Sequence, residues 1–260
     1  MISELIRSGK WRELRTPKYT PDQWTKLDAI ALKACDYRTS SLRLLRDKAS
    51  LTLDTSILAN TTLSLPITHS DVPADKVKDP VWLEAAGRRV GERLEKSLLG
   101  VDNLGPGECQ ADGLCTAPGR ITKILQGSFG DELYAAITLL KANKFYGPYI
   151  VLHGNSYDRW LDQDANDPEP VNRTVRQKLL DTISTVSHIQ RADLLSAKTI
   201  IVVQATNDVI RVVDALRPIV FEHNGGLKVA AIQVVQSLAE GLHALATSQL
   251  DRGIELIETV

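Results

Sequence analysis

The chain has 260 residues, of which 43% are hydrophobic, and this is enough for an ordinary globular core in one large or two small domains. No apolar run approaches the ~20 residues that a membrane-spanning helix needs, and the amino terminus lacks the apolar segment of a secretory signal. The composition excludes a disordered chain and an integral membrane protein, so we expect a soluble protein made in the cytosol.

The formal net charge is −1, but the charge is distributed unevenly. Residues 1–50 carry 11 Lys and Arg against 6 Asp and Glu, a balance of +5, which leaves −6 for the rest of the chain. A basic amino-terminal region on an otherwise acidic chain is typical of a segment that faces a polyanion such as nucleic acid. A solvated basic helix explains the same charge equally well, and this alternative stays open.

Residues 1–19 show little periodicity and predict an extended arm, or a short helix followed by a linker. An arm of this length cannot bury its own apolar side chains, so we expect it to dock on a neighbouring subunit. The side chains concerned are Ile2, Leu5, Ile6, Trp11 and Leu14.

A helix is predicted to begin directly after Thr20, because Thr20-Pro21-Asp22-Gln23 has the pattern of a capping box with proline at the first helical position. The apolar residues Trp24, Leu27, Ala31 and Ala34 fall on one face, which predicts an amphipathic helix to about Arg38.

The stretch from Leu51 to Thr68 alternates apolar and polar residues and predicts a two-stranded hairpin with Asn60 near its turn. Such a ribbon has no core of its own and is marginal unless it lies on another surface. A local hairpin on the same subunit is the alternative.

Asp79-Pro80 predicts the start of a long helix from Val81 to about Leu99. Its expected buried face repeats every four residues and contains Trp82, Ala86, Val90, Leu94 and Leu98. Gly87 and Gly91 weaken helix propensity by ~1 kcal/mol each relative to alanine, so we expect them to serve close packing.

The Gly- and Pro-rich residues 100–119 predict a long loop that matches neither a phosphate-binding nor a dinucleotide-binding motif. A helix over residues 130–143 follows. The acidic stretch from Gln163 to Pro170 lacks the central glycine of a calcium-binding loop. We therefore expect no cofactor and no metal site.

The most strongly patterned segment runs from Phe145 to Leu161. Gly147 can take the positive φ that ends a helix, and Pro148 prevents the helix from continuing. Tyr149–Leu152 predicts a short buried strand, and Gly154-Asn155-Ser156 predicts a turn.

The remaining elements are predicted from apolar periodicity and turn residues. A helix marked by Val175, Leu179 and Ile183 is expected to end near Ser187-His188. Strands are expected at Thr199–Ala205, Val209–Asp214, Ile219–Glu222 and Leu227–Leu238, with a hairpin turn at Asn224-Gly225-Gly226, a last strand near Leu242–Leu245 and an amphipathic end at Ile254 and Ile257.

The Gly-Pro-Tyr sequence, the apolar strand and the polar turn, followed by Tyr157, Trp160 and Leu161, resemble the encapsulin-like branch of HK97-type shell proteins. The order of elements matches this family over roughly Thr20 to Ile257. The resemblance implies an α+β, HK97-like shell fold. Its parts would be an N-terminal arm and helix (1–46), an E-loop hairpin (47–78), a P-domain with a spine helix (79–146 and 226–260) and a mixed α/β A-domain (147–225).

The resemblance implies a structural protein that self-assembles into an icosahedral capsid. A phage major capsid protein encloses viral double-stranded DNA, whereas an encapsulin nanocompartment encloses a cargo enzyme. The basic amino-terminal region favours the phage head. The helix near Trp24 favours the nanocompartment, since a comparable helix in encapsulins helps to form the groove for cargo targeting peptides.

For the phage head, the implied partners are further copies in pentamers and hexamers, packaged double-stranded DNA, and portal, scaffold or decoration proteins. No membrane is implied, and the expected location is the virion capsid, assembled in the host cytoplasm. The candidate lumenal, DNA-facing residues are Arg7, Lys10, Arg12, Arg15 and Lys18. The candidate structural or assembly residues are Trp24, Trp82, Gly147, Pro148, Tyr149 and Trp160.

A soluble hydrolase is the remote alternative, because His153 lies near Ser156 in the sequence and the two residue types can act as a base and a nucleophile. The strand is not followed by Gly-x-Ser-x-Gly, however, since the fifth position is Asp158. We expect a structural histidine, a turn-capping serine and no catalytic residues.

Overall fold

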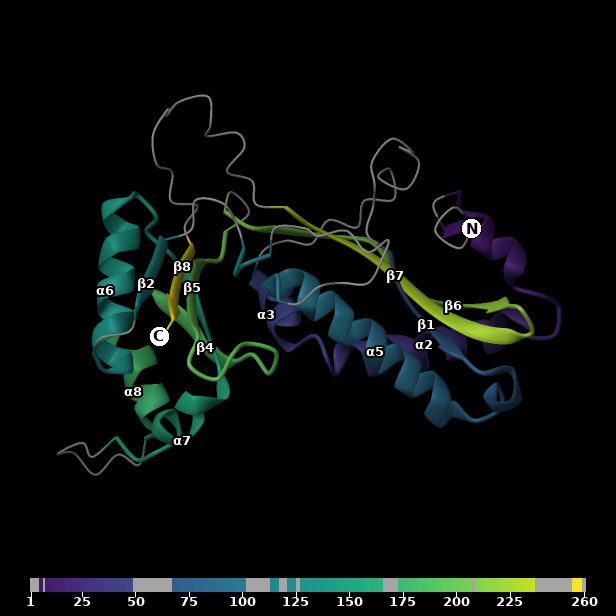
Figure 1. Ribbon diagram of the computed structural model, residues 1–260, viewed down its shortest axis with the longest axis horizontal. Helices are drawn as coiled ribbons and strands as arrows, with labels where there is room; N and C mark the ends of the chain where they lie inside the picture. Colours follow the sequence, from purple (N-terminus) through teal and green to yellow (C-terminus); the bar gives the residue numbers. More distant parts are fainter. Residues whose placement is uncertain are drawn as a thin grey trace. The chain divides into compact units, whose positions relative to one another are not determined.

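The computed structural model describes residues 5–6, 8–48, 67–101, 113–116, 121–124, 127–165, 173–206, 209–236 and 254–258. The chain divides into two compact units (Figure 1). Unit 1 comprises Met1–Leu98, Asp102–Ala111 and Val212–Gln236, and unit 2 comprises Leu99–Val101, Asp112–Arg211 and Ser237–Val260. This division into compact units does not test the predicted arm, E-loop, P-domain and A-domain, which stay a prediction.

Unit 1 combines helices with a three-stranded sheet. The helical elements are η1 (Lys10–Leu14), α2 (Pro21–Asp36), α3 (Ser40–Lys48), η2 (Ala74–Lys76) and α5 (Pro80–Leu99). The strands are β1 (Ile67–Val72), β6 (Arg211–His223) and β7 (Gly226–Gln236), in the order β1-β7-β6.

The predicted start of α2 is confirmed. The Thr20 hydroxyl accepts a hydrogen bond from the Gln23 amide at 3.3 Å, and the Gln23 side chain accepts one from the Thr20 amide at 2.8 Å. These two bonds satisfy the backbone N–H groups of Thr20 and Gln23, which have no carbonyl acceptor within the helix. Trp24 is buried, as its position on the apolar face predicts.

Helix α5 confirms the predicted long helix, and the close packing expected of its glycines occurs against α2. A Cβ atom at Gly87 would lie 2.7 Å from the Ala31 carbonyl oxygen, and one at Gly91 would meet the Cys35 carbonyl more closely still. The two glycines thus allow the backbones of α2 and α5 to approach each other.

The prediction that Trp82 lies on the buried face is wrong. Its side chain is 37% exposed, and the neighbouring Leu83 is buried instead. Each step of four residues overshoots a full helical turn by about 40°, so Trp82 lies about 160° around the helix from Leu98. A four-residue repeat over this length cannot stay on one face.

The hairpin turn at Asn224 is confirmed. Asn224 and Gly225 have φ values of 53° and 76°, the left-handed pair that a two-residue hairpin loop requires. The two strands predicted between residues 209 and 222 form the single strand β6. Strand β7 also pairs antiparallel with β1, from Ile67 opposite Ile232 to Val72 opposite Leu227. The rest of the hairpin predicted for residues 51–68 lies outside the described residues.

The N-terminal arm docks on its own sheet, which corrects the expectation that its apolar groups need a neighbouring subunit. Ile6 and Trp11 are 0% and 9% exposed. They belong to one apolar cluster with Ile67, Ala215, Ile219, Phe221, Ala230 and Ile232, and Leu14 packs at its margin.

Unit 2 contains a five-stranded mixed sheet with helices along one face (Figure 1). Its strand order is β2-β8-β5-β3-β4. The strands are β2 (Ile121–Ile124), β3 (Tyr149–His153), β4 (Val186–Arg191), β5 (Ile200–Gln204) and β8 (Ile254–Glu258), and the helices are α6 (Phe129–Ala142), η3 (Asn155–Tyr157), α7 (Asp158–Leu161) and α8 (Val175–Thr182).

The predicted strand at Tyr149 is confirmed and lies in the unit 2 core. All five residues of β3 are buried, and Tyr149 and Val151 pack with Leu133 and Leu140 of α6. Gly147 has the predicted positive φ, 92°, and the Gly147–Pro148 peptide bond is cis. Gly147 does not end the helix, however, because α6 ends at Ala142 and the positive φ that follows its end belongs to Lys144.

The predicted end of one helix needs correction. The helix marked by Val175 ends at Thr182, and Ser187-His188 belongs to β4, which pairs parallel with β3. The amphipathic end at Ile254 is strand β8, antiparallel to β5 and parallel to β2. The strand predicted at Leu242–Leu245 lies outside the described residues.

Candidate functional site

The basic residues predicted to face DNA fall into different environments. Lys10 and Arg12 are exposed, and Arg7 lies outside the described residues. Arg15 instead forms an ion pair with Asp28, in which both carboxylate oxygens accept from the same nitrogen, Nη2, at 2.7 Å. Lys18 lies 3.5 Å from a Glu222 carboxylate oxygen. Two of these five positive charges are therefore paired with carboxylates of unit 1.

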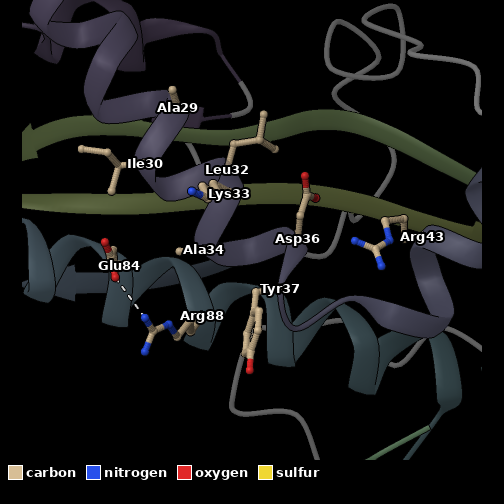
Figure 2. Close-up of a pocket in the computed structure, with 10 residues that line it drawn as sticks. All are labelled: Ala29, Ile30, Leu32, Lys33, Ala34, Asp36, Tyr37, Arg43, Glu84 and Arg88. Atoms are coloured by element: carbon tan, nitrogen blue, oxygen red, sulfur yellow. Dashed lines mark hydrogen bonds and ion pairs between the residues drawn. The ribbon is translucent and has the colours of Figure 1, made fainter. Parts of the chain in front are cut away.

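Helices α2, α3 and α5 of unit 1 enclose an open hollow of about 940 Å³ (Figure 2). Its apolar lining comes from one side of α2. Charged groups from all three helices surround this lining, and Arg88 and Glu84 pair with each other at 2.9 Å. The lining residues are Ala29, Ile30, Leu32, Lys33, Ala34, Asp36, Tyr37, Arg43, Glu84 and Arg88.

This mixture of groups suits a peptide segment better than a small polar ligand. Ile30 and Leu32 are only half-buried, and Tyr37 is 75% exposed. An apolar side chain of a partner would remove their surface from water, while the surrounding charges would fix its orientation.

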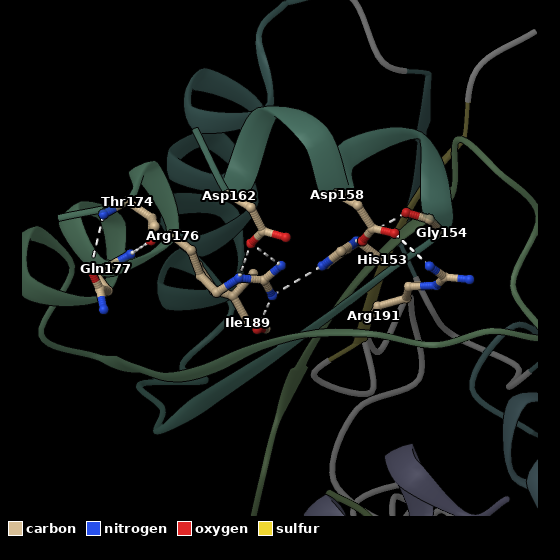
Figure 3. A network of polar contacts seen from close by, with 9 residues as sticks. All are labelled: His153, Gly154, Asp158, Asp162, Thr174, Arg176, Gln177, Ile189 and Arg191. Atoms are coloured by element: carbon tan, nitrogen blue, oxygen red, sulfur yellow. Dashed lines mark hydrogen bonds and ion pairs between the residues drawn. The ribbon is translucent and has the colours of Figure 1, made fainter. Parts of the chain in front are cut away.

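The end of β3 in unit 2 carries a buried polar network (Figure 3). The His153 side chain has no exposed surface. Its Nδ1 lies 2.9 Å from the Gly154 carbonyl oxygen, and its Nε2 lies 3.4 Å from Nη1 of Arg176. Arg176 also donates to the Ile189 carbonyl at 2.7 Å and to Asp162 at 3.1 Å.

These contacts define the protonation state of His153. A guanidinium has donors only, so Nε2 must accept and the proton resides on Nδ1, which donates to Gly154. Burial lowers the pKa of His153, and the Arg176 charge acts in the same direction. The Gly154 carbonyl, Asp158 and Asp162 oppose this shift without overcoming it. His153 is therefore a neutral, structural histidine.

The arrangement does not form the base and nucleophile pair of a hydrolase. Both ring nitrogens of His153 are directed at Gly154 and Arg176, whereas Ser156 is exposed and its amide donates to the Ala197 carbonyl at 2.9 Å. The short sequence separation therefore did not indicate a shared site.

The segment predicted to be structural is joined to its surroundings by hydrogen bonds. The Tyr149 hydroxyl donates to the Phe145 carbonyl, and the Ser187 hydroxyl donates to the Tyr149 carbonyl at 3.0 Å. Burial raises the pKa of Tyr149 to about 12, so it stays protonated and remains a donor at neutral pH. Trp160 is 37% exposed, with its ring 5.7 Å from that of Phe129.

Sequence reasoning missed the partners of His153. Thr174 and Gln177 form a capping box that places Arg176 in the first turn of α8, and this pattern is visible in the sequence. The contact of Arg176 with His153, 23 residues away, is not visible in the sequence, because it depends on how α8 packs beside β3 and β4.

No family model matches the chain, and no curated protein matches it. Solved structures do resemble it. A virus-like particle from Pyrococcus furiosus is similar with a TM-score of 0.50 and 14% identity, over 75% of this chain and 77% of that one. The capsid of Myoviridae Phage XM1 is similar with a TM-score of 0.50 and 11% identity, over 75% of this chain and 74% of that one. The chain therefore has the fold of capsid-type shell proteins.

Proposed function

We propose that this chain is a major capsid protein that self-assembles into a closed icosahedral shell around double-stranded DNA. The observation that carries the proposal is the likeness to two shell-forming proteins over three quarters of the chain. In this proposal α5 is the spine helix of an HK97-like subunit, and β1 ends the E-loop. The exposed Trp82 and Trp160 supply apolar surface for contacts between copies.

The proposed lumenal charge resides on Lys10 and Arg12, together with Arg7. Arg15 and Lys18 contribute less, because Asp28 and Glu222 already neutralise them. Exposed Lys and Arg side chains on the inner surface of a shell lower the free energy of confined DNA, because they screen the phosphate charges. Contacts between these side chains and phosphates weaken steeply as the salt concentration rises.

The experiment reverses charge without disturbing the ion pairs. Lys10→Glu with Arg12→Glu should leave assembly intact and lower the ratio of DNA-filled to empty particles on a density gradient. Lys141→Glu with Arg159→Glu is the matched control, because both residues are exposed in unit 2 and the change in net charge is equal. Equal ratios for the two double variants would refute a DNA-facing role for Lys10 and Arg12.

An encapsulin-type nanocompartment is the second candidate, and the hollow beside α2 favours it (Figure 2). A half-apolar hollow on the helix that resembles the cargo-groove helix suits a targeting peptide. The same gradient distinguishes the candidates: native particles that contain a protein cargo and no genome would exclude the phage head and support the nanocompartment.

A further inference from the structure

The outer edge of β6 is closed by side chains of the N-terminal region. Among the described strands of unit 1, β6 stands at the end of the order β1-β7-β6. An edge strand normally presents backbone groups that another strand can pair with. At Val220, however, the amide donates to Asp28 Oδ1 at 2.8 Å, and the carbonyl accepts from Arg15 Nε at 3.1 Å.

The two side chains together reproduce what a neighbouring strand offers. In an antiparallel ladder, a hydrogen-bonded residue exchanges both its N–H and its C=O with the residue opposite. Asp28 provides the acceptor and Arg15 the donor. The two are joined to each other by the ion pair at 2.7 Å, so they act on Val220 as one unit.

The surroundings hold this pair in place. The Arg15 guanidinium lies 5.1 Å from the Trp11 ring centre and 5.3 Å from that of Trp24. Both rings are buried, and the Arg15 and Asp28 side chains are only 21% and 26% exposed. Partial desolvation and two cation–π contacts make the pair stronger than an ordinary surface ion pair.

The neighbouring positions of β6 point to the same role. Alternate residues of a strand direct their N–H groups to the same edge, and Pro218, two residues before Val220, has no N–H to offer. On the other side of Val220, the Glu222 carboxylate accepts from the Thr16 hydroxyl at 2.7 Å. The segment around Arg15 is thus joined to β6 at the Val220 carbonyl and at the Glu222 side chain.

We propose that the Arg15–Asp28 pair is an edge latch, which prevents β6 from accepting a strand from a second copy of this chain. Opening the latch would turn this edge into a self-association site. A second copy is the expected occupant, because two identical antiparallel edges can pair with each other about a two-fold axis. The latch lies within unit 1 and acts whether or not the chain builds a shell.

The test opens the latch from either side. Asp28→Ala removes the acceptor, and Arg15→Met keeps much of the packing between the tryptophan rings while removing the donors. Arg12→Met is the matched control, because the Arg12 guanidinium also lies over Trp11, at 5.4 Å, but from an exposed position in η1. Hydrogen exchange of a peptide containing Val220 reports the latch, and thioflavin T fluorescence with the infrared amide I band reports new intermolecular sheet.

In dilute solution, the Val220 amide should exchange about fivefold faster in Asp28→Ala, as expected for the loss of its one net hydrogen bond. It should also exchange faster in Arg15→Met, because Asp28 then loses the ion pair that holds it against β6. As concentration rises, both should form thioflavin-positive assemblies in which this peptide becomes protected again, while Arg12→Met behaves as wild type. Faster exchange without new intermolecular sheet, or equal aggregation of Arg12→Met, would overturn the proposal.

A conservative variant covers the case in which Asp28→Ala fails to fold. Asp28→Asn keeps an oxygen for the Val220 amide and loses only the charge on Asp28. Its exchange and aggregation should be intermediate between those of wild type and Arg15→Met. Wild-type behaviour of folded Asp28→Asn and Arg15→Met would show that the pair does not guard the edge.

Discussion

His153 illustrates how a single buried residue links folding to pH. Its pKa is lowered chiefly by burial, and next by the Arg176 charge, while Asp158 and Asp162 oppose the change. The rings of Phe129 and Tyr157 complete its surroundings. The unfolded chain, with a histidine pKa of 6.5, binds this proton at higher pH than the folded protein does. Stability is therefore fully present above pH 6.5 and falls as the pH drops toward the lowered folded value.

We predict that acid destabilises the wild-type protein more than His153→Gln. Each unit by which the His153 pKa is lowered corresponds to about 1.4 kcal/mol lost from the free energy of unfolding at acid pH. The measurement is the melting temperature at pH values on either side of 6.5. His223→Gln, on the β6–β7 hairpin, is the control. If the pH slope of His153→Gln equals that of wild type, His153 does not carry the effect.

The sequence predicted the character of His153 but not its partners. A histidine at the end of an apolar strand is expected to be structural, and it is. The role of Arg15, in contrast, was not predictable, because composition indicates only that it is a basic residue in a basic region. Its pairing with Asp28 and its contact with Val220, 205 residues away, follow from the docking of the arm on β6, which no local pattern encodes.

At the scale of elements, the crossing of α2 and α5 depends on two glycines that are unfavourable for an isolated helix. Replacing a helix-interior glycine by alanine normally stabilises by about 1 kcal/mol. At Gly91 the added Cβ would collide with the Cys35 backbone, which cannot move as a side chain can. The steric penalty should therefore exceed the gain in helix propensity.

We predict opposite signs for two glycine-to-alanine changes. Gly91→Ala should lower the free energy of unfolding, whereas Gly130→Ala should leave it unchanged or raise it. The nearest atoms to a Cβ at Gly130 lie 3.8 and 4.0 Å away, which is ordinary contact. Denaturant unfolding of both variants provides the comparison. A Gly91→Ala protein as stable as Gly130→Ala would mean that the helices do not pack as described.

Elements with capping residues and sustained apolar periodicity were predictable from the sequence. Elements whose secondary structure depends on pairing with another strand were not. Capping residues located α2 and α5, and Asn224-Gly225 located the hairpin. Strand β4 was missed because only Val186 and Ile189 are buried among its six residues, a spacing that imitates a helix. Its strand character comes from parallel pairing with β3.

For the whole molecule, the resemblance of the Gly-Pro-Tyr segment and its flanking elements to shell proteins implied a shell fold. The two similar structures support that fold at only 14% and 11% identity with this chain. No helix in the described part of the chain is long and apolar enough to cross a membrane. The aromatic residues Tyr146, Trp82 and Trp160 are exposed, and in the proposed shell they would supply apolar surface for contacts between copies.

The central claim is that copies of this chain close into a shell, and the mass of the purified assembly tests it most directly. Light scattering with electron microscopy should find closed particles of uniform diameter and a mass far above that of the 28.6 kDa chain, unchanged on dilution until disassembly begins. Only monomers or dimers across a wide range of protein and salt concentration would contradict the claim.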